Sequence, residues 1–185
     1  IASDAALGNA ANVVNISGGS VLRARGDTTI NRTITVGTGG ATFAAGQDGA
    51  LEINGTLNAS GKDLGVEGQV TFGVAVNAAS LTLSDSDADA ETVTFSDDVT
   101  LSGGITSEAT AGDYDVVFGG AVSIAGGTNL NTTGTIDLTG GGTYAFTGGF
   151  SVADGSTTEI SGEIDASNAA VSLGNLVLTG NTTLD

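Results

Sequence analysis

Short apolar–polar–apolar triplets recur along the chain, often in pairs. Val93-Thr94-Phe95 is followed by Val99-Thr100-Leu101, and similar pairs return at 116–124, 144–152 and 171–178. Alternation with a period of two lets one face of a strand enter a core while Thr, Ser and Asp face water. Gly-Gly, Gly-Asn and Asp-Gly pairs between the triplets favour turns. The pattern predicts an all-β chain of short strands, ending with strands at 157–160, 163–166, 170–173, 176–179 and 182–184.

The triplets also form a longer repeat, marked by an aromatic residue at one place in the unit. The marker positions are Phe43, Phe72, Phe95, Phe118 and Phe146, with Leu173 next in line. Their separations are 29, 23, 23, 28 and 27 residues, a period typical of solenoids. Three strands and three turns fit one such interval, whereas an antiparallel sandwich or barrel gives no reason for Phe to recur at one phase.

The repeat therefore predicts a parallel β-helix of about seven coils of roughly 23–29 residues, about 35 Å long. We expect the six marker residues to form one core ladder, with each ring above the next. Residues 1–185 are expected to form a single β-helix segment. Residues 1–19 are a weakly defined start, with a strand at 13–16 and one helical turn at 5–7, and residues 20–185 form the coils.

Neither end of the sequence has the polar character of a solenoid cap. An open last coil exposes a sheet edge and the core. We therefore expect a fragment of a longer rod, or an edge that joins another copy end to end.

Composition excludes several kinds of chemistry. The chain has 31 Gly and 26 Thr, but no Cys, His, Pro, Met or Trp. Ser–His–Asp catalysis requires His, and thiol chemistry requires Cys. No run of 18 apolar residues is present, so no membrane insertion of this segment is expected. We predict that the segment is not an enzyme.

Charge is distributed unevenly. Residues 1–62 hold all four cations and four acids, whereas residues 63–185 hold seventeen acids and no cation, for a net charge of −17. Phosphate backbones and anionic membranes are bound by Lys and Arg, so nucleic acid is excluded as a partner. Such an acidic surface favours solubility or calcium-rich surroundings.

One stretch resembles a known repeat. "VLRARGDTTINRTITVGTGGATFAAGQDGALEINGTLNASG" is similar to the repeat of bacterial autotransporter passenger domains, with strands at 29–37 and 51–55 around a Gly39-Gly40 turn and the strand at 41–43. "VVFGGAVSIAGG" at 116–127 resembles the looser repeats of passengers and of haemagglutinin-like surface proteins. The resemblance implies a right-handed parallel β-helix, export through the outer membrane and an extracellular location on the bacterial surface, without implying an activity.

Two loops are candidate sites. Arg25, Gly26 and Asp27 spell the tripeptide that integrins bind, although a simple turn also accounts for them. Asp85, Asp87, Asp89 and Glu91 form the densest acid cluster, and calcium prefers several such oxygens in a flexible loop. A solvated acidic loop is the simpler interpretation of this cluster. Calcium is thus the one candidate cofactor.

Paired threonines suggest a third possibility. Thr33/Thr35, Thr92/Thr94 and Thr133/Thr135 would suit an ice-binding face if they formed an unbroken array, but coils of unequal length should break it.

The sequence leads to a hypothesis about function. We expect a non-catalytic structural and adhesive stalk of a secreted bacterial surface protein, with host or neighbouring cell surfaces, or copies of itself end to end, as partners. The alternative is a calcium-bridged surface-layer, matrix or filament-forming protein.

Overall fold

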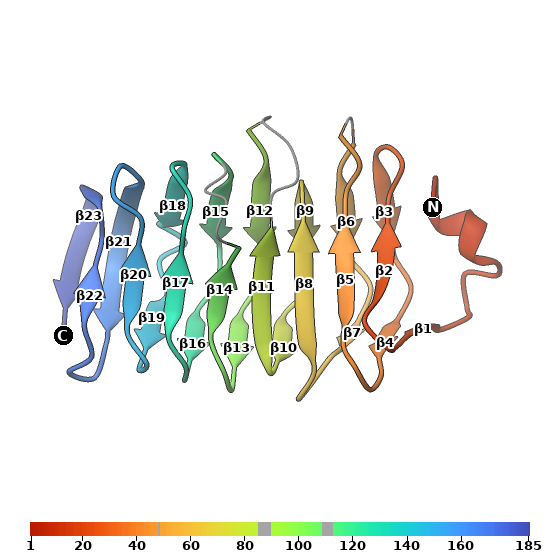
Figure 1. Cartoon of the computed structure of the whole chain (residues 1–185), viewed down its shortest axis with the longest axis horizontal. Coiled ribbons are helices and arrows are strands. Elements are labelled where there is room, and N and C mark those ends of the chain that lie inside the picture. Colours follow the sequence, from red (N-terminus) through yellow and green to blue (C-terminus); the bar gives the residue numbers. More distant parts are fainter. Residues whose placement is uncertain (48, 85–89, 109–112) are drawn as a thin grey trace.

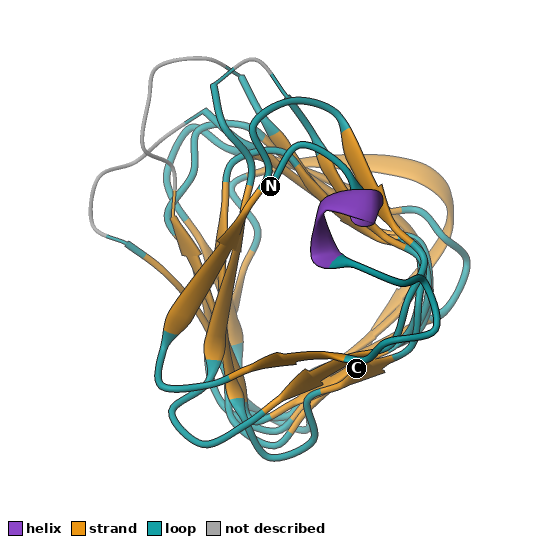
Figure 2. Cartoon of the chain, turned by 90° about the vertical axis from the view of Figure 1, so that its right-hand side faces the viewer, coloured by secondary structure: helices purple, strands orange, loops and turns teal. Residues whose placement is uncertain are grey.

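The chain winds into a right-handed parallel β-helix whose coils stack along the long axis, as the sequence predicts (Figure 1, Figure 2). The computed structural model describes residues 1–47, 49–84, 90–108 and 113–185. Apart from the short 3-10 helix η1 (Asp4–Leu7), the regular elements of these residues are strands. All their strand pairs are parallel, and there are about seven turns.

Each coil has three faces, which we number in chain order. The first face contains β2 (Ser20–Arg23), β5 (Ala41–Ala44), β8 (Asp63–Glu67), β11 (Ser80–Ser84), β14 (Ile105–Ser107), β17 (Thr128–Leu130), β20 (Phe150–Val152) and β22 (Val171–Ser172). The second contains β3 (Thr28–Ile30), β6 (Leu51–Ile53), β9 (Val70–Phe72), β12 (Thr92–Phe95), β15 (Asp115–Phe118) and β18 (Thr135–Leu138). The third contains β1 (Val14–Ile16), β4 (Ile34–Val36), β7 (Leu57–Asn58), β10 (Val76–Ala78), β13 (Val99–Leu101), β16 (Val122–Ile124) and β19 (Thr143–Phe146).

Two long strands join the second and third faces near the C-terminus. β21 (Thr157–Asp165) pairs with β18 through its first half and with β19 through its second half. β23 (Asn175–Leu184) follows β21 round the same corner. The separate short strands expected at 157–160 and 163–166 are thus one bent strand. Gly162, at φ 129°, lies at this bend, where the register shifts.

The core is a column of inward side chains from all three faces. Along β9, for example, Val70 and Phe72 are buried while Thr71 between them is partly exposed. The same alternation holds in most strands, because successive side chains of a strand point to opposite faces. Parallel pairing in register then places each inward residue beside the equivalent residue of the next coil.

The predicted aromatic ladder is correct for three of its six members. Phe72, Phe95 and Phe118 are in register on the second face. Their ring centroids are 5.4 and 5.2 Å apart, with nearly parallel planes. Such pairs contribute about 0.5–1.5 kcal/mol beyond the burial of their area.

The other three members lie on other faces, so a single six-residue ladder is wrong. Phe43 is buried on the first face and meets Phe72 edge-on at 5.7 Å. Phe146 is buried on the third face, 4.4 Å from Phe150 across the corner. Leu173 follows β22 of the first face and is only partly buried. A triplet ending in an aromatic residue fits any inward position, so the sequence pattern could not assign the face.

This assignment also explains the length of the coils. Register partners lie 17 to 24 residues apart, as between β8 and β11 or between β14 and β17. These values fall at or below the lower end of the Phe spacing. The intervals near 28 residues connect Phe residues on different faces, and therefore measure more than one coil.

The N-terminal end is covered, contrary to the expectation that neither end is a cap. Residues 1–12 fold over the first coil, and η1 lies across its opening (Figure 2). The predicted helical turn is therefore present, as η1. Ile1 and Leu7 pack against the core. The cap shields the inward side chains of the first coil from water.

Arg32 holds this cap in place. Its side chain is buried, and its Nε donates to the Asp4 carboxylate at 2.6 Å. Its remaining four hydrogen bonds go to the backbone carbonyls of Leu7, Asn9, Asp4 and Gly8. All five guanidinium donors are thus used. The sequence gives no sign of this role, because Arg32 and Asp4 are 28 residues apart.

We expect Phe95→Ala to destabilise the β-helix by about 3–5 kcal/mol, because it opens a cavity between two stacked rings. Phe95→Leu keeps most of the volume and should cost less than about 1.5 kcal/mol. Urea unfolding followed by circular dichroism measures both values. Equal effects of the two substitutions would contradict the role assigned to the stack.

We expect Arg32→Lys to release the cap while the coils stay folded. Lysine has three donors and no planar fork, so amide exchange of residues 1–12 should accelerate about tenfold or more, or roughly 1.4 kcal/mol. Arg25→Lys is the matched control, since the Arg25 side chain is exposed. The same acceleration in both variants would argue against the cap contacts.

Candidate functional site

The longest connections gather along one corner of the rod, between the first and second faces. We call it the loop corner. Among its connections are residues 24–27, 45–50, 85–91, 108–114, 131–134 and 153–156. Most connections at the other two corners have three or four residues. Both candidate sites found in the sequence belong to the loop corner, three coils apart.

The tripeptide at 25–27 forms a turn between β2 and β3. Arg25 and Asp27 are exposed. The Asp27 carboxylate accepts a hydrogen bond from the backbone N–H of Ala50 in the next coil, at 3.1 Å. This contact gives the turn a structural role, as the simpler interpretation expects. Integrin recognition stays a prediction.

The contact of Asp27 recurs at two other strand starts. The Asp98 carboxylate accepts from the N–H of Ala121 at 2.9 Å, and that of Asp115 accepts from Thr135 at 2.6 Å. In each case an aspartate at the start of a strand binds the backbone one coil further on. Part of the acidic surplus therefore joins coils. The sequence analysis missed this role, although the position of Asp beside a strand start was a usable signal.

The acid cluster proposed for calcium lies mostly outside the described residues. Asp85, Asp87 and Asp89 belong to the undescribed part, while Glu91 is buried at 8% exposure. The backbone carbonyl of Glu91 accepts from the N–H of Asp115 at 2.8 Å. Within the described ranges, no three His, Cys, Asp or Glu residues are grouped closely enough to hold a metal ion. Calcium binding stays a prediction.

Charge compensation is concentrated near the N-terminal end. Arg23 pairs with Glu67 at 2.7 Å and Arg32 pairs with Asp4, and these are the salt bridges of the described residues. Glu67 is thus the one acid after residue 62 that such a bridge neutralises. Most of the rod consequently repels a second copy.

The threonine pairs do not form an array. Thr94 has Thr71 and Val117 as register neighbours, and Thr35 has Asn15 and Asn58. The rows outside the strands thus mix Thr with Asn, Val and acids. This arrangement gives no support for ice binding.

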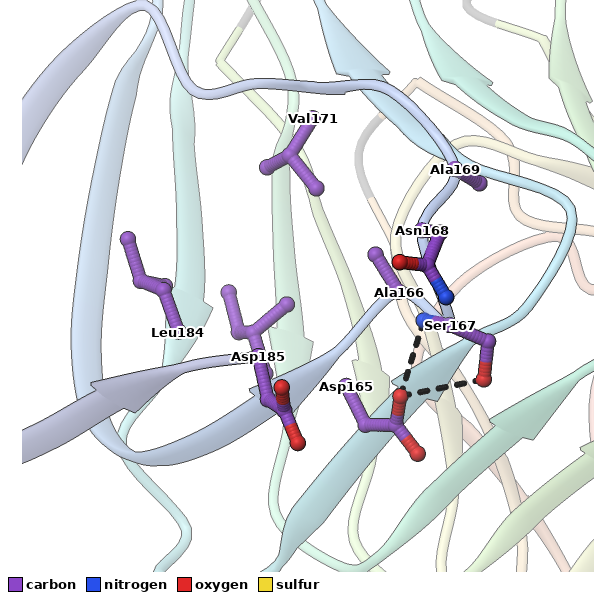
Figure 3. Close-up of a pocket in the computed structure, with 9 residues that line it drawn as sticks. Asp165, Ala166, Ser167, Asn168, Ala169, Val171, Leu184 and Asp185 are labelled. Atoms are coloured by element: carbon purple, nitrogen blue, oxygen red, sulfur yellow. Dashed lines mark hydrogen bonds between the residues drawn. The ribbon is translucent and has the colours of Figure 1, made fainter.

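The C-terminal end of the rod is open. A hollow of about 630 Å³ lies between the turn at 166–169 and the end of β23. Figure 3 shows Val171, Leu184 and Ala166 around it, with Asp165 and Asp185 at one side. The Asp165 carboxylate accepts from the N–H of Ser167 at 2.8 Å and from its hydroxyl at 3.1 Å. These bonds hold the turn in which Ser167 and Asn168 have positive φ.

Two buried hydroxyls in the last coils lack a hydrogen-bond partner among the described residues, those of Thr128 and Tyr144. Burial raises the pKa of Tyr144 above its ordinary value of 10.0, while the backbone of residues 140–142 acts in the opposite direction and Asp137 adds to the rise. The neutral phenol is therefore the form that the core accepts.

No family model, curated protein or solved structure matches this chain. Within the described residues, no helix has the length and apolar character needed to cross a membrane. Arguments about function therefore rest on the residues and the geometry above.

We expect the stability contributed by a neutral Tyr144 to be fully present below pH 10 and to be lost as pH rises further, because the unfolded tyrosine ionises first. Tyr144→Phe should raise stability near neutral pH by about 1 kcal/mol and weaken the loss above pH 10. Urea unfolding at a series of pH values measures both effects.

Thr128→Val is the matched control for this prediction. It removes the other unpartnered hydroxyl, and should also raise stability, but by an amount that does not change with pH. A Tyr144→Phe variant with the same alkaline loss as the wild type would contradict the assignment.

Proposed function

We propose that this chain is a non-catalytic section of a rod displayed on the outside of a bacterial cell, with a structural and adhesive role. The observation that carries the proposal is the continuous parallel coil with its connections gathered at the loop corner. A hydrogen-bonded column keeps its shape without a large globular core. Connections on one edge can reach a partner surface without disturbing the column.

The residues that resemble passenger repeats support this proposal. The stretch at 29–37 contains β4 and most of β3, residues 41–43 lie in β5, and residues 51–55 contain β6. Gly39 and Gly40, both with positive φ, form the corner between β4 and β5. The similar sequence thus coincides with one complete coil, including its glycine turn.

The chemistry of the surface is consistent with exposure to other cells. Seventeen acids without a cation in residues 63–185 keep the rod soluble and away from anionic lipid and nucleic acid. Exposed Arg25 and Asp27 supply a candidate attachment turn on the loop corner.

Antibodies against the purified chain test the location. We expect them to label intact source cells as strongly as permeabilised ones. Trypsin treatment of intact cells should remove the label, while a cytoplasmic marker stays untouched. Label confined to permeabilised cells would refute surface display.

A calcium-bridged lattice is the second candidate, because Glu91 brings a buried carboxylate to the connection that holds Asp85, Asp87 and Asp89. Calcium should then raise the melting temperature and produce ordered sheets, and chelation should reverse both changes. Replacement of the four acids by Asn and Gln is the matched control. A rod indifferent to calcium in both forms favours the adhesive stalk.

A further inference from the structure

The last coil presents core positions to solvent. Leu176, Leu178 and Leu184 of β23 are the register partners of Thr158, Ile160 and Ile164 of β21, which are buried. Yet these three leucines are 43%, 61% and 55% exposed. In every earlier coil, such positions are covered by the coil that follows. The end of the rod is therefore an apolar surface of the kind that a further β-coil covers.

β23 is also an edge strand without the usual protection. Ten residues long, it pairs with β21 alone among the described strands. It contains no charge and no proline, although the chain carries −17. Edge strands that avoid association are typically short, charged or interrupted by proline. This edge is thus the part of the acidic rod where a second copy meets least repulsion.

The opposite end of the rod does not offer a matching surface. η1 and the five hydrogen bonds of Arg32 cover the first coil. Growth of a filament by stacking the C-terminal end of one copy on the N-terminal end of the next would require the cap to open. An open C-terminal end therefore finds its match in the same end of another copy.

We propose that two copies of this chain associate tail to tail through β23, in a closed two-fold dimer. The two β23 strands run antiparallel across a two-fold axis that passes near Val177 and is perpendicular to the rod. This arrangement lets the edge N–H and C=O groups pair and gives an isologous contact that closes after two copies. It is independent of the surface display proposed above.

The symmetry also matches the other faces. The rotation that brings the second face onto itself exchanges the first and third faces. It places Leu184 of one copy over the partner's strand β22, where Val171 is 38% exposed. Leu176 comes beside the partner's Leu178. The apolar surfaces thus meet each other and close the hollow of both copies.

Sedimentation velocity over a range of protein and salt concentrations tests the proposal. We expect a monomer–dimer equilibrium that shifts toward the dimer as salt increases, because Asp165 and Asp185 border the contact and the two copies repel each other at low ionic strength. Amide exchange of residues 175–184 should slow as the dimer forms. This readout needs no variant, so it does not depend on the folding of a mutant.

The double substitution Leu176→Lys with Leu178→Lys should weaken the dimer on the order of a hundredfold or more, because it places unpaired charges in an apolar contact. Val21→Lys is the matched control, as Val21 is 53% exposed near the capped end, and should leave the dimer intact. A monomer at all concentrations in high salt would overturn the proposal. So would trimers and longer polymers, or a dimer that the lysines leave unchanged.

Discussion

Register between neighbouring coils is the constraint on which the whole molecule depends. Each strand of three to five residues is too short to be stable alone. Parallel pairing with the coils before and after it satisfies the backbone and places Phe72, Phe95 and Phe118 against one another. Because each coil contacts mainly its neighbours, stability is approximately a sum of coil and interface contributions. The variable connections can then change length without disturbing the column.

The same constraint makes the two ends the critical parts of the rod. A column of stacked coils has two surfaces where the inward side chains lose a neighbour. At one end Arg32 places a buried charge against Asp4 and four carbonyls, so that a polar segment covers the first coil. At the other end Leu176 and Leu178 stay open to contact. The difference gives the rod a direction, and our proposed dimer follows from it.

Acidic residues serve the fold as well as the surface. Asp27, Asp98 and Asp115 each bind a backbone N–H of the next coil. They accept hydrogen bonds where the ladder between strands begins and backbone donors would otherwise face a corner. The acids without such partners give the rod the negative charge that limits association to its uncharged edge.

The sequence by itself determined the all-β class, the solenoid, most strand positions and the burial of all five marker Phe residues, because alternation and period are local properties of the chain. It also excluded chemistry that requires His or Cys. Only the tertiary structure decided which face each Phe occupies, since Phe43, Phe72 and Phe146 share one local pattern and differ only in the coil geometry around them. It alone joined Arg32 to Asp4 and merged the two segments of β21 into one strand. These features depend on contacts between residues about one coil or more apart, and a local pattern carries no information about such contacts.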